Sequence, residues 1–228
     1  LELETFLYRA SHDLRGPITS MQGLLNIIRL ENNSYLQSIH FDFLHKTIHK
    51  LERTLIKLIQ KHTIQQSTLS LEEIDSVLLV NIINKVTKSM ACFRPQDFEI
   101  DVQKDVSFVS DISMFTIALA NLLENAFFFS ENSTNPKVLL KAEQDQYGVS
   151  ISILDNGAGI RSDIKNKIFT MFFRGHVNST GNGLGLYLVK GALDKIDGKI
   201  TLDTESGKYS RFTITLKASE EEAKYAYQ

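Results

Sequence analysis

The chain has 228 residues, 43% hydrophobic and 23% charged, a composition typical of a globular protein with room for one large domain or two smaller ones. A formal net charge of −2 gives no basic surface for nucleic acid, and no stretch reads as the run of about 18 apolar residues that a membrane span needs. The single cysteine, Cys92, cannot form an internal disulfide, which favours a reducing compartment. We therefore expect a soluble, cytoplasmic protein that binds no nucleic acid.

Two long helices are predicted at the start of the chain. Residues 1–31 carry apolar side chains three and four positions apart, the spacing that places one stripe along a helix. A polar run at 31–34 interrupts the pattern, which resumes at residue 36 and ends near residue 65, so the two helices form an antiparallel hairpin. The apolar stripe is too long for one partner helix to cover, and we expect a homodimer with a four-helix bundle. Because the chain begins in helical rhythm without a methionine, we also expect an upstream sensor or membrane anchor.

The pattern changes after the polar stretch 65–68, so we predict a helical domain at 1–66 and a second domain at 67–228. Helices grouped with a mostly antiparallel, mixed sheet indicate an α/β sandwich, which makes the whole chain an α+β protein. The second domain is predicted to have short helical turns around 161–172, helices at 77–91, 112–129 and 184–195, and strands at 69–74, 97–103, 106–110, 137–145, 148–155, 199–204 and 210–217.

The predicted helix at 112–129 carries two asparagines, Asn121 and Asn125, one turn apart on one face of an otherwise almost entirely apolar segment. Burying two carboxamides without partners costs about 2 kcal/mol or more, so something must bind them. They either cap a neighbouring strand or loop, or they bind a ligand.

Two glycine-containing segments follow. The predicted strand at 148–155 runs into the sequence DNGAG at 155–159, where a carboxylate meets a turn through which backbone can approach a ligand. Taken alone, Asn-Gly is equally compatible with a type I′ hairpin turn. Further on, the sequence GNGLG at 181–185 precedes a helix and would expose backbone N–H groups to phosphate oxygens. Its spacing differs from the dinucleotide fingerprint, and the chain has no G-x-x-x-x-G-K-[ST] phosphate loop.

In this order, these segments resemble the N, G1 and G2 boxes of the ATP-binding domain shared by histidine kinases, gyrase-type ATPases and heat-shock chaperones. The intervening sequence IFTMFFRG resembles the F box that is specific to histidine kinases within that superfamily. The resemblance implies ATP and Mg²⁺ as cofactors, with Asp155 accepting a hydrogen bond from the adenine amine and Asn125 ligating Mg²⁺ beside Asn121. The other residues that it assigns to nucleotide binding are Gly157, Gly159, Phe169, Arg174, Gly181, Gly183 and Gly185.

One departure from the family concerns phosphate binding. The family often has lysine and tyrosine three and four residues after the magnesium-ligating asparagine, where this chain has Phe128 and Phe129. Either another cation substitutes for that lysine, or phosphate is bound more weakly. We expect Arg174 to substitute, in preference to a residue of the glycine loop such as His176.

The motif SHDLRGP at 11–17 resembles the H box of histidine kinases of the common dimerisation class. A neutral imidazole is a competent nucleophile at neutral pH, and Asp13 can accept its Nδ1–H and leave Nε2 to attack phosphorus. The resemblance implies a protein-histidine kinase that autophosphorylates His12 and passes the phosphoryl group to an aspartate in the receiver domain of a response regulator. We interpret the other five histidines as solvated or packed.

Gly16 and Pro17, which follow the histidine in this motif, bear on the expected activity. Pro17 lacks an N–H group and predicts a bend in the first helix. Gly16 stands where the class usually has a threonine or asparagine that positions water, so we expect weak or absent phosphatase activity.

The alternative interpretation is a catalytically silent, ATP-binding dimeric scaffold, a pseudokinase that acts by conformational switching. The two phenylalanines and Gly16 favour this scaffold, whereas the intact pair of His12 and Asp13 argues against it.

Overall fold

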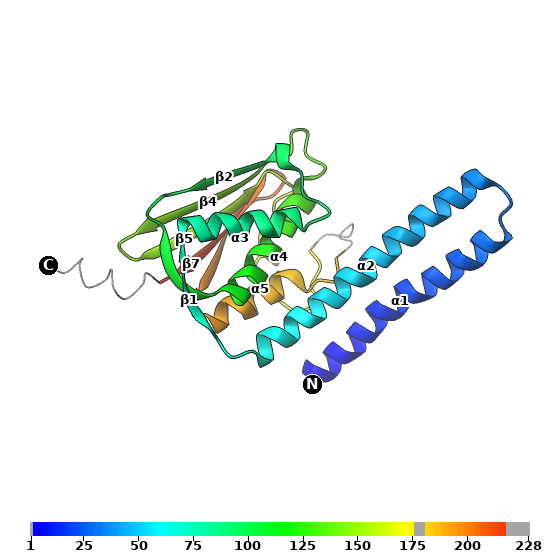
Figure 1. Cartoon of the computed structure of the whole chain (residues 1–228), viewed down its shortest axis with the longest axis horizontal. Coiled ribbons are helices and arrows are strands. Elements are labelled where there is room, and N and C mark those ends of the chain that lie inside the picture. The colour runs from blue at the N-terminus through cyan, green and yellow to red at the C-terminus, as the bar shows by residue number, and fades with distance from the viewer. Residues whose placement is uncertain (1, 176–180, 218–228) are drawn as a thin grey trace. The chain divides into compact units, whose positions relative to one another are not determined.

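The structure is a computed structural model and describes residues 2–175 and 181–217. The chain forms two compact units, Leu1–Thr63 and Ile64–Gln228, and each is described by itself (Figure 1). The division falls in the last turn of the second helix, which ends at Gln66. We therefore keep 1–66 and 67–228 as the proposed domains.

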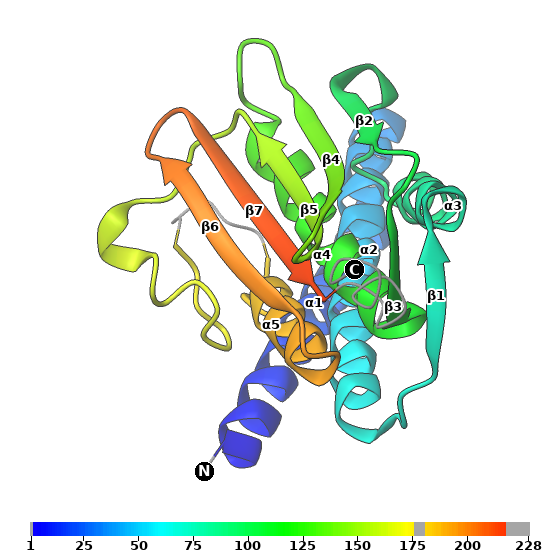
Figure 2. The same ribbon diagram turned by 90° about the vertical axis from the view of Figure 1, so that its left-hand side faces the viewer.

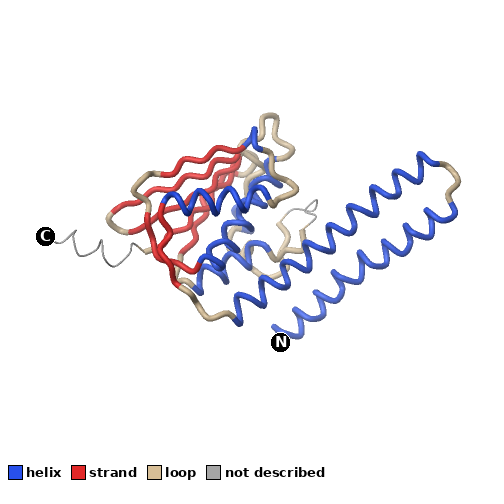
Figure 3. Tube along the Cα trace, viewed as in Figure 1, coloured by secondary structure: helices blue, strands red, loops and turns tan. Residues whose placement is uncertain are grey.

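The first unit is a pair of antiparallel helices, α1 (Glu2–Leu30) and α2 (Ser34–Gln66), joined by a short loop (Figure 3). The side chain of Asn33 caps α2 by accepting hydrogen bonds from the backbone N–H groups two and three residues later, at 3.0 and 3.3 Å. Gln37 Nε2 donates to the carbonyl oxygen of Glu31 at 2.6 Å, just beyond the end of α1. Polar side chains in and beside the loop therefore hold the predicted hairpin turn.

The hairpin keeps open space around Gly16 and a long apolar surface. α1 continues through Gly16 and Pro17 without interruption, and a Cβ added at Gly16 would meet no atom within 4 Å. The bend expected at Pro17 stays a prediction.

Large apolar side chains along the hairpin remain between 40% and 56% exposed in the single chain, namely Ile18, Leu25, Ile27, Leu36, Phe41, Phe43, Ile48, Leu55, Ile56 and Ile59.

The second unit is built on a five-stranded mixed sheet with the strand order β2-β4-β5-β7-β6 and a separate two-stranded antiparallel sheet of β1 and β3. In the large sheet β2 and β4 are parallel and all other neighbours are antiparallel. The strands are β1 (Leu71–Asp75), β2 (Phe98–Val102), β3 (Ser107–Asp111), β4 (Val138–Asp145), β5 (Gly148–Asp155), β6 (Lys199–Glu205) and β7 (Tyr209–Leu216).

Helices cover one face of this sheet. They are α3 (Ser76–Lys88), α4 (Ile112–Ser130) and α5 (Gly185–Lys195), with short 3₁₀ turns at Pro95–Asp97 and Ser162–Ile164. Figure 2 looks onto the other face of the sheet, with α4 and α5 behind it. Buried and half-buried residues alternate along β4 and β5, as a sheet covered on one side requires. The α+β class and the α/β sandwich are thus confirmed.

α4 is the core helix of the second unit. Eleven of its residues are buried, among them Phe115, Leu119 and Phe127. Within the described residues it is the one helix whose length and mean hydropathy, 1.5, would suit a membrane span, and its burial in the second unit is that of a core helix. The high hydropathy follows from packing on several sides, against β5 and α5 in particular.

The predicted helix at 77–91 is shorter than expected, because α3 ends at Lys88. Ser89 Oγ donates to the carbonyl oxygen of Val86 at 2.7 Å, and the N–H of Met90 donates to that of Thr87, so the chain leaves the helix in a tight turn. The other helices and strands of the second unit lie within two residues of their predicted bounds.

The C-terminal end of α5 is tied to the start of the second unit. Lys195 Nζ donates to the carbonyl oxygens of Ile64 and Ser67 at 2.5 Å each, and to Ser67 Oγ at 3.3 Å. A Cβ added at Gly191 would lie 3.6 Å from the side chain of Ile64. A lysine in the last turn of one helix thus binds the end of another helix and the segment after it, where carbonyl groups lack partners.

Candidate functional site

Asp155 is the last residue of β5, a central strand of the large sheet, and it is only 3% exposed. Its Oδ1 accepts a hydrogen bond from the N–H of Gly157 at 2.9 Å. Burial raises the pKa of the Asp155 carboxyl to about 7, because the charged form loses its hydration, and the bond from Gly157 opposes that rise only in part. A buried carboxyl poised between its two protonation states suits recognition more than structural support.

The glycines after Asp155 are required by close contacts. A Cβ at Gly157 would lie 2.4 Å from the carbonyl oxygen of Phe129, and one at Gly159 would lie 2.1 Å from that of Glu205. Gly159 also has φ of 61°, which favours glycine. Neither Asn156 nor Gly157 has positive φ among the described residues, and β5 does not continue into a neighbouring strand there, so a type I′ turn is excluded.

The two asparagines of α4 lie beside the start of α5. Asn121 is 1% exposed, and its Nδ2 donates to the carbonyl oxygen of Ile117 at 2.8 Å, so α4 itself satisfies part of this carboxamide. Part of the partner expected for the Asn121 carboxamide is therefore α4 itself, and ligand binding by the two asparagines stays a prediction. A Cβ at Gly185 would lie 3.4 Å from Asn121 Oδ1 and 3.7 Å from Asn125 Oδ1. Both amide oxygens thus approach the N-terminus of α5, whose first N–H groups and dipole favour anions.

The segment that resembles the F box is joined to the second glycine segment by backbone. The N–H of Phe172 donates to the carbonyl oxygen of Gly183 at 2.9 Å, and both residues have positive φ, 63° and 70°. Phe169 packs edge-on against Phe212 with ring centres 6.5 Å apart. Arg174 is exposed, as is Gly181, while His176 lies outside the described residues. The structure therefore brings these two segments together but does not test the role expected for Arg174.

An open cleft of about 790 Å³ lies against Gly157. It is lined by Phe128 and Phe129 from the end of α4, by residues 132–135 from the loop after α4, by residues 156–158, and by Gly207 and Lys208 from the turn before β7. Sequence reasoning missed residues 132–135, because no motif marks loop residues that a fold brings together. The two phenylalanines, in contrast, were expected at this site.

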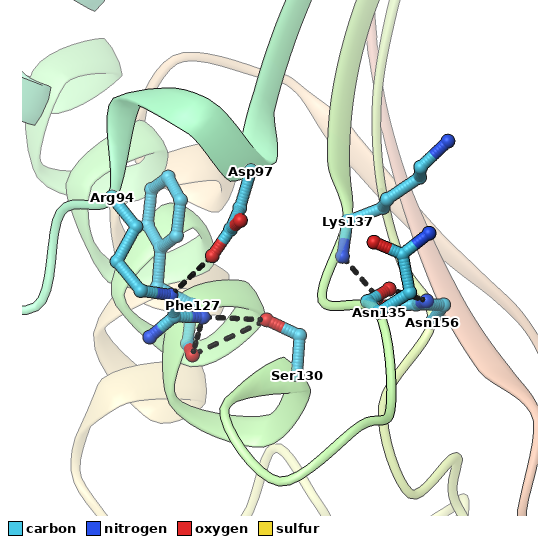
Figure 4. A network of polar contacts seen from close by, with 7 residues as sticks. All are labelled: Arg94, Asp97, Phe127, Ser130, Asn135, Lys137 and Asn156. Carbon is cyan, nitrogen blue, oxygen red and sulfur yellow. Dashed lines mark hydrogen bonds and ion pairs between the residues drawn. The ribbon is translucent and has the colours of Figure 1, made fainter.

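Two networks of hydrogen bonds lie next in the chain to residues that line the cleft (Figure 4). Arg94 Nη2 donates to the carbonyl oxygen of Phe127 and to Ser130 Oγ, both at 3.1 Å, and Arg94 Nε pairs with Asp97 Oδ2 at 2.6 Å. These bonds satisfy the C-terminal turn of α4, which carries the two phenylalanines. The second network surrounds Asn156 and binds the loop after α4 to the end of β5.

His12 lies on α1 in the first unit, and its side chain is 79% exposed. Its Nδ1 is 3.4 Å from Asp13 Oδ1, longer than a strong hydrogen bond, although such contacts often tighten when a substrate binds. The imidazole is therefore open to approach and has a carboxylate beside one ring nitrogen. Among the described residues, no group of three histidine, cysteine or acidic side chains could hold a metal ion. An amide oxygen such as Asn125 Oδ1 fits Mg²⁺ that is bound mainly through a nucleotide's phosphates.

Comparison with known proteins identifies the class of the second unit. Residues 110–220 match the family described as "Histidine kinase-, DNA gyrase B-, and HSP90-like ATPase". The heme sensor protein HssS of Staphylococcus saprophyticus is 24% identical over 221 residues, which is 93% of this chain. The histidine protein kinase SaeS of Staphylococcus epidermidis is 27% identical over 237 residues, which is 95% of this chain. The chain spans 46% of HssS and 64% of SaeS.

Solved structures share the fold over both units. The histidine kinase AdeS of Acinetobacter baumannii has a TM-score of 0.70 at 24% identity and covers 92% of this chain and 98% of its own. The histidine kinase ThkA, in complex with the response regulator protein TrrA, has a TM-score of 0.70 at 22% identity and covers 93% of this chain and 61% of its own. Residues 110–220 thus match a family that includes the histidine kinases, and the chain is similar to sensor histidine kinases over more than nine-tenths of its length.

Proposed function

We propose that this chain is the core of an ATP-dependent protein-histidine kinase, which autophosphorylates His12 and passes the phosphoryl group to an aspartate in the receiver domain of a response regulator. One observation carries the proposal: a single chain holds an exposed histidine paired with a carboxylate on a helical hairpin and an ATPase domain of the histidine kinase class. The solved complex of the histidine kinase ThkA with the response regulator protein TrrA supports the partner class.

His12 and Asp13 supply the chemistry of the first step. Asp13 accepts the Nδ1–H of the ring, which leaves a lone pair on Nε2. Nε2 attacks the γ-phosphorus, an N–P bond forms, and the bond from that phosphorus to the oxygen of ADP breaks, with the electron pair leaving on ADP. Asp13 stabilises the ring cation that forms. Mg²⁺, when it is bound with Asn125 as a ligand, neutralises phosphate charge.

Each part of the second unit has a matching proposed role. Asp155, when ionised, accepts from the adenine amine, and a guanine carbonyl at that position would face it as acceptor against acceptor. The N-terminus of α5 and the glycines at 181, 183 and 185 bind phosphate oxygens. Arg174 replaces the cation that is lost where the chain has Phe128 and Phe129.

The hairpin surface supports a homodimer. Ten large apolar side chains along α1 and α2 are between 40% and 56% exposed in the single chain, for example Ile18, Phe43 and Ile59. A second copy that completes a four-helix bundle would remove this surface from water. We place the core in the cytoplasm, either as a free protein or as part of a membrane-anchored sensor.

Incubation with Mg-ATP labelled at the γ-phosphate tests the kinase reaction. We expect an acid-labile, alkali-stable label on the wild type, no label on His12→Gln, and full label on the matched control His45→Gln, whose ring lies elsewhere on the hairpin and packs against His49. A wild type that binds ATP and never becomes labelled would establish the scaffold in place of the kinase.

The fate of the phosphorylated regulator tests the role of Gly16. We expect weak or absent phosphatase activity because Gly16 has no side chain to position water, and the open space around it means that Gly16→Thr fits without a clash. The measurement is dephosphorylation of the regulator by the ADP-bound protein. Rapid dephosphorylation at a rate that Gly16→Thr does not change contradicts the expectation.

A further inference from the structure

Both the backbone and the side chain of Asn156 make hydrogen bonds to the loop between α4 and β4. Figure 4 shows the side-chain contacts with Asn135 and Lys137. Its Oδ1 accepts from the N–H of Lys137 at 2.8 Å, and its Nδ2 donates to the carbonyl oxygen of Asn135 at 2.7 Å. Its carbonyl oxygen accepts from Ser133 Oγ at 2.8 Å, and its N–H donates to the carbonyl oxygen of Lys137 at 3.3 Å. A single residue therefore attaches most of the loop to the end of β5.

The chemistry of this contact selects asparagine. The loop presents one N–H donor and one carbonyl acceptor to the side chain, and a carboxamide answers both at once. Aspartate would place a carboxylate oxygen against the carbonyl of Asn135, and alanine would leave both loop groups without this partner. Asn156 is half-buried, and its carboxamide makes both of these bonds.

The loop is one wall of the cleft that Asn156 and Gly157 also line, and Gly157 donates its N–H to Asp155 Oδ1. Residues 132–135 line the cleft together with the end of α4 and with Gly157. The backbone of Phe129, one residue before the end of α4, is so close to Gly157 that a Cβ there would lie 2.4 Å from its carbonyl oxygen. Asn156 thus lies between Asp155, which faces the proposed adenine position, and Gly157, which touches the helix that leads into the loop.

We infer that Asn156 is a positioning residue for the nucleotide site: its two side-chain hydrogen bonds to Asn135 and Lys137 hold the wall of the cleft at the distance from Asp155 that adenine requires. This inference rests on the proposed function. Because these hydrogen bonds join the loop to the end of β5 and involve neither Asn125 nor the start of α5, Asn156 acts on ATP binding and leaves the rate of transfer at saturating ATP unchanged.

The variant Asn156→Ala removes both side-chain bonds. We expect its Kd for ATP, measured by titration calorimetry, to rise about tenfold, its KM for ATP in His12 labelling to rise equally, and its kcat at saturating ATP to stay within about twofold. Hydrogen exchange of the Lys137 amide should accelerate before nucleotide is added. The matched control is Asn81→Ala on the exposed face of α3, which should change neither constant.

A milder variant guards against loss of folding. Ser133→Ala removes one bond to the carbonyl oxygen of Asn156 and should raise the Kd for ATP by about two- to threefold. Thermal unfolding shows whether each variant is folded. Faster exchange of the loop with an unchanged Kd for ATP in Asn156→Ala overturns the inference, because the bonds would then be structural only. A fall in kcat with an unchanged KM overturns it too. A wild type that does not bind ATP overturns the proposed function itself.

Discussion

The substitution Asp155→Asn separates the stability of the second unit from its recognition of adenine. Asp155 is buried at the end of β5, and its Oδ1 accepts the N–H of Gly157 at 2.9 Å. An asparagine of the same size keeps that bond through its own Oδ1. Its Nδ2 then occupies the position of the second carboxylate oxygen, so a donor replaces an acceptor at the place proposed for the adenine amine.

The stability effect follows from the pKa. The pKa of the Asp155 carboxyl is about 7 in the folded protein, against about 3.9 in an unfolded chain. Between these values the folded state binds more protons than the unfolded state, so the free energy of unfolding falls as pH rises through this window. One pKa unit corresponds to about 1.4 kcal/mol, which makes the total loss about 4 kcal/mol above pH 7. Asp155→Asn does not titrate and should avoid this loss.

The binding effect has the opposite sign. Loss of a hydrogen bond to a charged acceptor costs about 1.5–3 kcal/mol, which is a fall of roughly 10- to 150-fold in affinity for ATP. In the wild type, affinity should rise with pH up to about 7 and then level off, because adenine needs the ionised carboxyl. Asp155→Asn should lose this part of the pH dependence. Because the titration of ATP itself affects both proteins, the difference between wild type and variant isolates the titration of Asp155.

Denaturant unfolding and titration calorimetry from pH 4 to 9 measure both effects. We expect the difference in unfolding free energy between Asp155→Asn and the wild type to grow with pH and to level off above pH 7. A difference that does not change with pH would mean that the carboxyl is not destabilised by burial. An Asp155→Asn variant that binds ATP as tightly as the wild type at pH 8 would refute the adenine contact.

Gly159→Ala should prevent stable folding, because its Cβ would lie 2.1 Å from a carbonyl oxygen. Gly185→Ala should fold, because its nearest contact would be at 3.4 Å, but it should weaken ATP binding. Thermal unfolding measures the first effect and calorimetry the second. Arg94→Ala removes a half-buried cationic donor from the end of α4 and should lower the free energy of unfolding by about 2 kcal/mol in urea titrations. Lys195→Met keeps the length of the side chain but loses its bonds to two carbonyl groups, and it should increase proteolytic cleavage near residue 67 with little change in Kd for ATP. Equal cleavage of Lys195→Met and Lys190→Met, a lysine on the exposed side of α5, would contradict that role.

Periodicity was sufficient for the hairpin and for the order of elements in the second unit. The two amphipathic helices and the alternating strands each bury one face, and burial of one face is what periodicity records. The end of α3 was misplaced because it depends on Ser89 and Thr87, whose hydroxyl groups bond to the helix backbone in ways that propensity does not capture. The bonds of Arg94 to the end of α4 join residues 33 and 36 positions apart, and no local pattern announces them.

The glycine and aspartate positions of the proposed nucleotide site were selected because they form motifs, and the structure explains why glycine is needed at 157 and 159. The loop at 132–135 could not, because its position depends on Asn156, a residue of a recognised motif whose side chain points to a distant segment. Asn121 shows the converse limit: its polarity was noticed, yet its bond within α4 depends on a rotamer that only the structure supplies.

α5 makes contacts at both of its ends. Its first residue, Gly185, lies against the asparagines of α4. Its last residue, Lys195, donates hydrogen bonds to the carbonyl oxygens of Ile64 and Ser67, at and just after the end of α2. Eleven residues at about 1.5 Å each span roughly 16 Å, and a helix of that length tilts as one body. A displacement of its glycine end would therefore also move Lys195 and the segment at 64–67 to which Lys195 donates hydrogen bonds.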